Sequence, residues 1–112
     1  MLSKINRLKK TAEIERVFKR GRGVREDFLF LKAAENNLRV IRFAFVVSKK
    51  ISGKASSRNK IKRILRAAAR RRLPRLKTGL DVVIVVHGGI ENKNFQEIEQ
   101  SVDKLFKKAK LT

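Results

Sequence analysis

Apolar residues recur at helical spacing in three segments of this chain. The clearest segment runs from Ser57 to Arg72, and a second covers residues 94–110. A shorter one extends from Thr11 to about residue 20. Because this spacing places apolar side chains on one face of a helix, it predicts three amphipathic helices. The residues that stand at expected N-cap positions are Thr11, Ser57 and Asn94.

Three other segments have the pattern of strands. Residues 40–47 alternate most clearly, with Ile41, Phe43, Phe45 and Val47 on one face and Val40, Arg42, Ala44 and Val46 on the other. Residues 28–31 form a continuous apolar run with two phenylalanines, and residues 81–86 are mostly Val and Ile. We expect the last of these strands to be buried on both faces. The arginine at position 42 indicates that its face of the sheet is partly open.

The order of these elements predicts an α+β fold, roughly α-β-β-(β)-α-β-α, arranged as a two-layer α/β sandwich. A long helix separates the strands at 40–47 and 81–86, so we expect these strands to be parallel neighbours in one sheet. Helices would cover one face of the sheet. The other face, or a groove beside the helix at residues 57–72, which is rich in Lys and Arg, would be left for a ligand. The chain has 112 residues and neither a repeat nor a linker, so we expect a single domain over residues 1–112.

Charge changes this picture most at the middle helix. The chain has 30 Lys and Arg against 10 Asp and Glu, a formal net charge of +20. No acidic residue occurs from Asn36 to Leu80, a stretch that includes the whole basic helix. Solvated helix faces usually mix both signs of charge, whereas this face carries one. A polyanion, and nucleic acid first, is therefore the expected partner.

The aromatic residues point toward single-stranded nucleic acid. There are seven Phe and no Trp or Tyr. Most of them are expected in the core, but one or two on an open sheet face could stack on unpaired bases. A DNA-binding protein of the nucleoid would fit the charge alone, and the phenylalanines favour RNA over duplex DNA.

Several other classes of function have no support in the sequence. The chain has no Cys, which excludes disulfides and thiolate metal sites and fits a reducing cytoplasm. His87 is the single histidine, and the few carboxylates form no evident acid–base pair. We therefore expect no catalytic residue and no metal ligand in the protein itself. No apolar run approaches the roughly 18 residues of a spanning helix, so we expect no membrane insertion.

The motifs resemble those of the bacterial ribonuclease P protein subunit. The resemblance is strongest for Arg58-Asn59-Lys60-Ile61-Lys62-Arg63, which follows Val47-Ser48-Lys49-Lys50-Ile51. Asn6-Arg7-Leu8-Lys9-Lys10 and Val17-Phe18-Lys19 also fit the family, in the same order along the chain. The resemblance covers nearly the whole sequence.

This resemblance implies a fold with a left-handed crossover and a non-catalytic role in an endoribonuclease. In the family, an RNA subunit with Mg²⁺ cuts the 5′ leader from precursor tRNA, and the protein binds both RNAs. We accordingly expect a monomer in a 1:1 complex with the catalytic RNA, acting in the cytoplasm, with no cofactor bound by the protein alone. The residues expected to bind the catalytic RNA are Lys49, Lys50, Arg58, Asn59, Lys60, Lys62, Arg63, Arg66 and Arg70. Those expected in a cleft for the leader are Phe18, Phe28, Phe30 and Arg42.

Two other readings of the same residues remain open. A ribosomal protein or a general RNA chaperone would share the charge pattern but would support no specific cleavage. A self-sufficient nuclease would cut without an RNA partner, and the scarcity of carboxylates and histidine argues against it.

Overall fold

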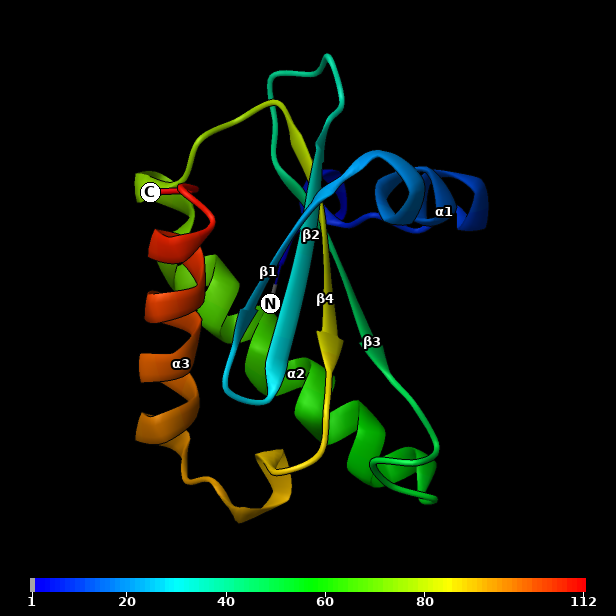
Figure 1. The fold of residues 1–112 in the computed structure, drawn as a ribbon, viewed down its shortest axis with the longest axis vertical. Coiled ribbons are helices and arrows are strands. Elements are labelled where there is room, and N and C mark those ends of the chain that lie inside the picture. Colours follow the sequence, from blue (N-terminus) through cyan, green and yellow to red (C-terminus); the bar gives the residue numbers. More distant parts are fainter. Residues whose placement is uncertain (1) are drawn as a thin grey trace.

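The computed structural model describes residues 2–112 and contains three helices packed on a four-stranded sheet (Figure 1). The helices are α1 (Thr11–Arg20), α2 (Ala55–Arg72) and α3 (Phe95–Lys108), and the strands are β1 (Arg22–Glu26), β2 (Leu29–Glu35), β3 (Arg42–Val47) and β4 (Leu80–Val86). Three short 3₁₀ helices, Lys4–Asn6, Leu73–Arg75 and Ile90–Asn92, complete the described elements. The predicted α+β class and element order are confirmed, and β1 is the further short strand.

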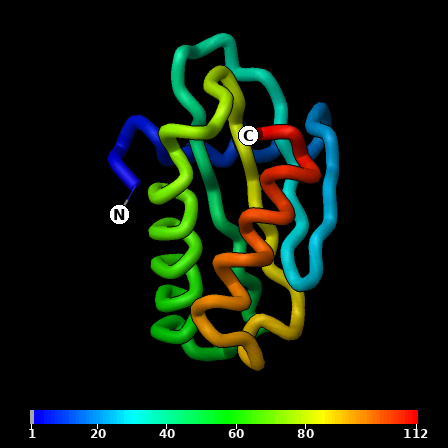
Figure 2. Tube along the Cα trace, turned by 90° about the vertical axis from the view of Figure 1, so that its left-hand side faces the viewer, coloured from blue at the N-terminus to red at the C-terminus, as the bar shows by residue number. Residues whose placement is uncertain are grey.

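The sheet has the order β1-β2-β4-β3. β2 pairs antiparallel with both β1 and β4, whereas β3 and β4 are parallel, as predicted. Figure 2 views the sheet from the side of α2 and α3, with β3 and β4 running downward and β4 to the right of β3. The connection through α2 is therefore left-handed, against the strong right-handed preference of such units.

The main core lies between the sheet and the pair α2 and α3. Phe43 stacks on Phe45 and on Phe106, with ring centroids 6.0 and 5.8 Å apart. Leu65 of α2 and Ile84 of β4 are buried in the same cluster. This is the face on which the alternation of residues 40–47 placed the large apolar side chains, so that prediction is confirmed.

The opposite face of the sheet is covered only in part, by α1. Leu8, Val17, Ala44 and Val83 form a smaller buried cluster there. The expectation that helices would cover one face alone was therefore wrong, because Val17 brings α1 into a buried cluster with Ala44 of β3 and Val83 of β4. Figure 1 shows α1 on one side of the sheet and α3 on the other.

Several boundaries differ from those that the sequence predicted. α2 begins at Ala55 with Lys54 as its N-cap, and α1 has Lys10 as its N-cap, with no side-chain capping bond in either case. The predicted cap of α3 is confirmed: Asn94 and Glu97 form a reciprocal capping box. Of the three predicted N-caps, only Asn94 is correct, and it is the one whose side chain accepts a hydrogen bond from the backbone of its own helix.

A buried carboxylate joins α1 to the sheet. Asp81, at the start of β4, has no exposed surface and accepts hydrogen bonds from Arg42, Arg16 and Asn36 at 2.7–3.0 Å. Arg42 also donates to Glu13 of α1 at 3.0 Å. Burial by itself would raise the pKa of Asp81, but the hydrogen bonds and the two guanidinium charges outweigh it and hold that pKa below its usual value.

We predict that replacing Asp81 by Ala destabilises the protein by about 3–5 kcal/mol at neutral pH, because it leaves Arg42 half-buried without its main partner. Urea unfolding would measure this loss. The control Glu26→Gln removes a pair whose Lys108 is exposed, and it should cost at most about 1 kcal/mol.

The stability difference between the wild-type protein and Asp81→Ala should depend on pH, because it comes from an ionised carboxylate. A carboxylate with a lowered pKa stabilises the fold above its unfolded value of about 4, and this stabilisation is lost as the pH falls through the folded pKa. The difference in unfolding free energy between wild type and Asp81→Ala, measured with urea at several pH values, should therefore become smaller in acid. A gap that stays constant down to acid pH would contradict the role of an ionised Asp81.

Candidate nucleic-acid interface

The outer face of α2 carries basic residues that have no acidic partner. Asn59, Lys60, Arg63 and Arg70 are exposed, whereas Leu65, Ala68 and Ala69 on the inner face are buried. Within residues 2–112 none of the expected RNA-binding cations forms a salt bridge. These residues are Lys49, Lys50, Arg58, Lys60, Lys62, Arg63, Arg66 and Arg70, and with Asn59 we call them the α2 basic surface.

The last turn of α2 has a different role. Arg71 donates two hydrogen bonds to Glu99 of α3, at 2.9 and 2.7 Å, and its guanidinium lies 5.2 Å from the ring centre of Phe95. Arg72 is buried and bonds to Glu99 and Asp103. These two arginines hold α2 to α3, so charge alone does not decide which arginines are free for a ligand.

The loop before α2 is tied to the helix. The guanidinium of Arg58 donates to the carbonyl of Ser52 at 2.8 Å, and the amide of Ile51 donates to the carbonyl of Ser48. This closes the loop that carries Lys49 and Lys50, both of which are exposed. In Figure 1 this loop and the beginning of α2 extend toward the side of the sheet on which α1 lies.

Arg7 adds a cation that the sequence analysis did not include among the site residues. It forms a parallel bridge with Phe43, and its side chain donates to the carbonyl of Leu2. The pKa of Arg66 is lowered, first by burial and second by the positive charge of Arg7. The two arginines therefore repel each other in the free protein, and a bound phosphate would relieve that repulsion. The Asn6-Arg7 motif in the sequence could have indicated that Arg7 belongs to the RNA-binding site.

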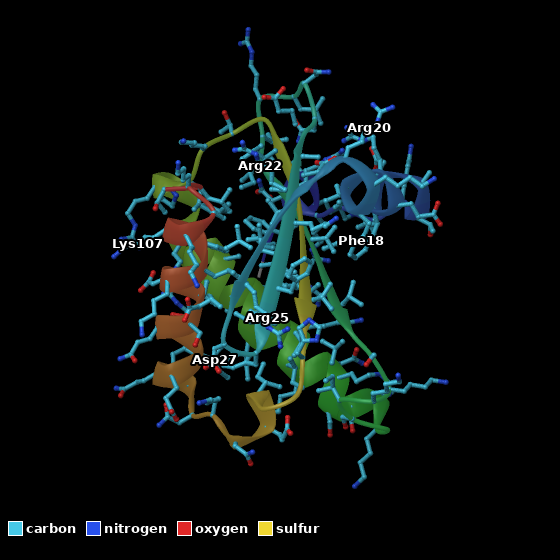
Figure 3. All side chains as sticks on the ribbon, in the orientation of Figure 1. Phe18, Arg20, Arg22, Arg25, Asp27 and Lys107 are labelled. Carbon is cyan, nitrogen blue, oxygen red and sulfur yellow. The ribbon has the colours of Figure 1, made fainter. Side chains whose placement is uncertain are left out.

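The uncovered part of the α1 side of the sheet presents a second type of surface. Phe18 projects from α1 with 37% of its surface exposed, and Figure 3 shows it beside the sheet below α1. Phe30, Val46 and Val85 are half-buried on this face. His87 packs edge-on against Phe30, with ring centroids 6.4 Å apart. We call this area the open sheet face.

Gly23 allows the ring of Phe30 to lie across β1. A Cβ atom at position 23 would come within 2.9 Å of Cζ of Phe30, closer than real contacts allow. Arg25, the cross-strand neighbour of Phe30, is exposed beside it. Lys32 on the same face donates to the carbonyl of Phe18 at 2.7 Å. An aromatic side chain and cations thus lie together on an accessible surface, as in single-strand binding sites.

Two of the residues expected in the leader cleft are not available to a ligand. Phe28 is only 2% exposed: it lies in the turn between β1 and β2 and its ring belongs to the main core, so its assignment to an open cleft was wrong. Arg42 is on the predicted face, but its guanidinium is bound to Asp81 and Glu13. Those bonds raise the pKa of Arg42 against the opposing effect of burial. Arg42 therefore fixes α1 and is not free to bind a phosphate.

The described residues 2–112 show neither a metal-binding cluster nor a membrane span. No three His, Asp or Glu side chains in this range lie close enough together to hold a metal ion. None of the helices there is both long and apolar enough to cross a bilayer.

Comparison with known proteins gives a consistent result. The family model for ribonuclease P matches residues 2–110. A ribonuclease P protein component of Caldanaerobacter subterraneus subsp. tengcongensis is 40% identical over 111 residues, which cover 99% of this chain and 95% of that protein. One from Thermoanaerobacter sp. is 36% identical over the same length, with the same coverage.

Solved structures agree with the fold. A Staphylococcus aureus RNase P protein mutant with defective mRNA degradation activity superimposes with a TM-score of 0.91 at 27% identity, covering 97% of this chain and 92% of that one. The RNase P protein from Thermotoga maritima gives a TM-score of 0.82 at 27% identity, with coverage of 90% and 94%.

We predict that Arg63→Gln lowers the salt dependence of RNA binding, whereas Arg71→Gln leaves it nearly unchanged. Arg63 is exposed and has no ion pair in residues 2–112, while Arg71 is already paired with Glu99. Losing one phosphate contact should reduce the slope of log K against log salt by about 0.7–0.9. Fluorescence anisotropy with a structured RNA at several salt concentrations would test this. Equal slopes for wild type and Arg63→Gln would remove Arg63 from the phosphate contacts.

Proposed function

The chain belongs to the ribonuclease P protein family, and we propose that it binds both the catalytic RNA of this endoribonuclease and the 5′ leader of precursor tRNA. The proposal rests on the α2 basic surface, whose cations form no salt bridge within residues 2–112, and on the open sheet face, whose Val46 lies on β3 just before the loop that carries Lys49 and Lys50. One surface suits phosphates and the other suits unpaired bases.

The α2 basic surface would hold the folded catalytic RNA. Each Lys or Arg that neutralises a phosphate releases a condensed counterion, which is the main source of affinity for RNA. Arg63 and Arg66 can each contact two phosphate oxygens, and Asn59 can reach a base edge or a sugar hydroxyl. Because Arg71 and Arg72 are bound to α3, the contact would use α2 as far as Arg70 and the loop before it.

The open sheet face would hold the single-stranded leader. Phe18 and Phe30 offer rings on which successive bases can stack, and Arg25 offers a cation for the backbone. Stacking depends little on base identity, so this face would accept leaders of many sequences. A mature tRNA has no leader and would not use this surface.

The chemistry of cleavage would belong to the RNA. When bound there, Mg²⁺ would activate the attacking water and stabilise the leaving oxygen. The protein, with its net charge of +20, would neutralise RNA phosphates and so reduce the Mg²⁺ concentration that the folded complex requires. We propose a 1:1 complex of one protein with one catalytic RNA, acting in the cytoplasm.

We predict that this protein restores accurate 5′ cleavage of a precursor tRNA by a bacterial ribonuclease P RNA at a magnesium concentration too low for the RNA alone. The measurement is single-turnover cleavage with and without the protein, and with the protein alone as the control. Binding without stimulation would instead indicate a general RNA-binding protein. Cleavage by the protein alone would refute the proposal that the RNA subunit carries out the cleavage chemistry.

Phe18→Ala should weaken binding of a leader-bearing precursor to the protein–RNA complex by roughly 1–3 kcal/mol, which is the range for loss of one stacked base, and should spare mature tRNA. Phe95→Ala is the matched control, because Phe95 is also exposed, at 53%, but lies on α3. An equal loss for precursor and mature tRNA, with a lower melting temperature, would show that Phe18 serves only the packing of α1.

A further inference from the structure

A basic groove, separate from the α2 basic surface, lies at the opposite edge of the sheet from α2. It has a volume of about 1060 Å³ and lies where the start of β1, the end of β2, the end of α1 and the C-terminal end of α3 meet. α2 packs on β3 at one edge of the strand order, and this groove adjoins β1 at the other. The cations that line it are Arg16, Arg20, Arg22, Lys77, Lys108 and Lys110, and we call it the β1-edge groove.

Four of these six cations have no salt bridge and no side-chain hydrogen bond within residues 2–112. Arg16 is bound to Asp81 and Lys108 to Glu26, whereas no such bond is present for Arg20, Arg22, Lys77 and Lys110. Glu35 is the single carboxylate in the lining. Figure 3 shows Arg20 at the end of α1 and Arg22 at the start of β1. The groove therefore has an uncompensated positive charge of the same kind as the α2 basic surface.

The segments that form the groove are fixed to one another in the free protein. The amide of Lys77 donates to the carbonyl of Leu111 at 2.8 Å, which joins the segment before β4 to the end of the chain. The ammonium of Lys108 donates to the carbonyl of Arg25 at 2.9 Å, and Arg16 donates to the carbonyl of Glu35 at 2.9 Å. The groove is thus formed before any ligand binds, so little ordering would oppose binding.

Lys110 occupies a position where glycine is usual. It follows the end of α3 with φ of +59°, and the closing bonds run from Lys110 to Lys107 and from Leu111 to Phe106. A left-handed residue at this position is most often glycine, because a Cβ is strained there. The lysine adds a cation to the groove but strains the backbone, and such strain is typical of functional positions.

The lining decides what kind of nucleic acid suits the groove. It contains no aromatic side chain, so unpaired bases would find nothing to stack on. A double-helical RNA presents phosphates and 2′-hydroxyls outward and keeps its bases paired, and proteins recognise it by these groups and by shape. We propose that the β1-edge groove binds the phosphate backbone of a double-helical RNA segment, separately from the α2 basic surface. The protein would then bridge two RNA segments at opposite edges of its sheet.

The test uses a 20-base-pair blunt RNA duplex and the full chain in a background that removes charge from α2, Lys62→Gln/Arg63→Gln/Arg66→Gln. In this background the duplex should still bind. Adding Arg22→Gln and Lys110→Gln should lower the slope of log K against log salt by about 1.8, at 0.9 for each lost phosphate contact. The readout is fluorescence anisotropy over a range of KCl concentrations.

The matched control adds Arg39→Gln and Lys104→Gln to the same background. It removes the same charge from two exposed residues that do not line the groove, and it should leave the slope nearly unchanged. Failure of the background protein to bind the duplex, or equal slopes for the groove variant and the control, would overturn the proposal. If circular dichroism shows that the groove variant is unfolded, Arg20→Gln/Lys77→Gln replaces it with the same expected result. Because the duplex needs no catalytic RNA, this outcome is separate from that of the cleavage assay.

Discussion

Asp81 is the residue at which α1, β3 and β4 are held together, and the position of Phe18 depends on it. A fully buried carboxylate is costly unless several donors compensate it. Here Arg42 and Arg16 supply two charges and Asn36 a further hydrogen bond. Because Arg16 belongs to α1, the cluster fixes that helix across one part of the sheet. The remainder of this face, with Phe30, stays accessible.

The use of the few acidic residues also determines where the protein can bind RNA. Glu13 and Asp81 neutralise arginines under α1, and Glu99 and Asp103 neutralise those between α2 and α3. The chain has 10 acidic residues for 30 basic ones, and most of the cations in residues 2–112 form no salt bridge. Eight of these cations lie on the α2 basic surface, and four more line the β1-edge groove. Ion pairs thus hold the helices in place, and the remaining charge is left for phosphates.

Local patterns predicted the elements but not every contact between them. The alternation of Phe43 and Phe45 and the capping box of Asn94 are properties of short segments, and both predictions are confirmed. Phe28 was assigned wrongly, and the helical spacing of residues 94–110 did not reveal that Phe95 is exposed. Phe28 enters the core because a turn at Asp27, with φ of +55°, redirects the chain, and Phe95 stays exposed beneath Arg71. Both outcomes depend on residues distant in sequence or on backbone angles, which periodicity does not report.

The left-handed connection between β3 and β4 has a direct consequence for the site. With this strand order, a right-handed connection would place α2 on the face where α1 lies, over Phe30, Val46 and Val85. The face that carries Phe43, Phe45 and Ile84 would then lose the cover that α2 provides and keep only α3. The face with Phe43, Phe45 and Ile84 carries larger apolar side chains than the face with Ala44 and Val83. Burying the larger side chains under α2 gives more hydrophobic free energy, which favours the left-handed connection. The distribution of large and small residues between the two faces of β3 and β4 therefore keeps the aromatic face open to a ligand.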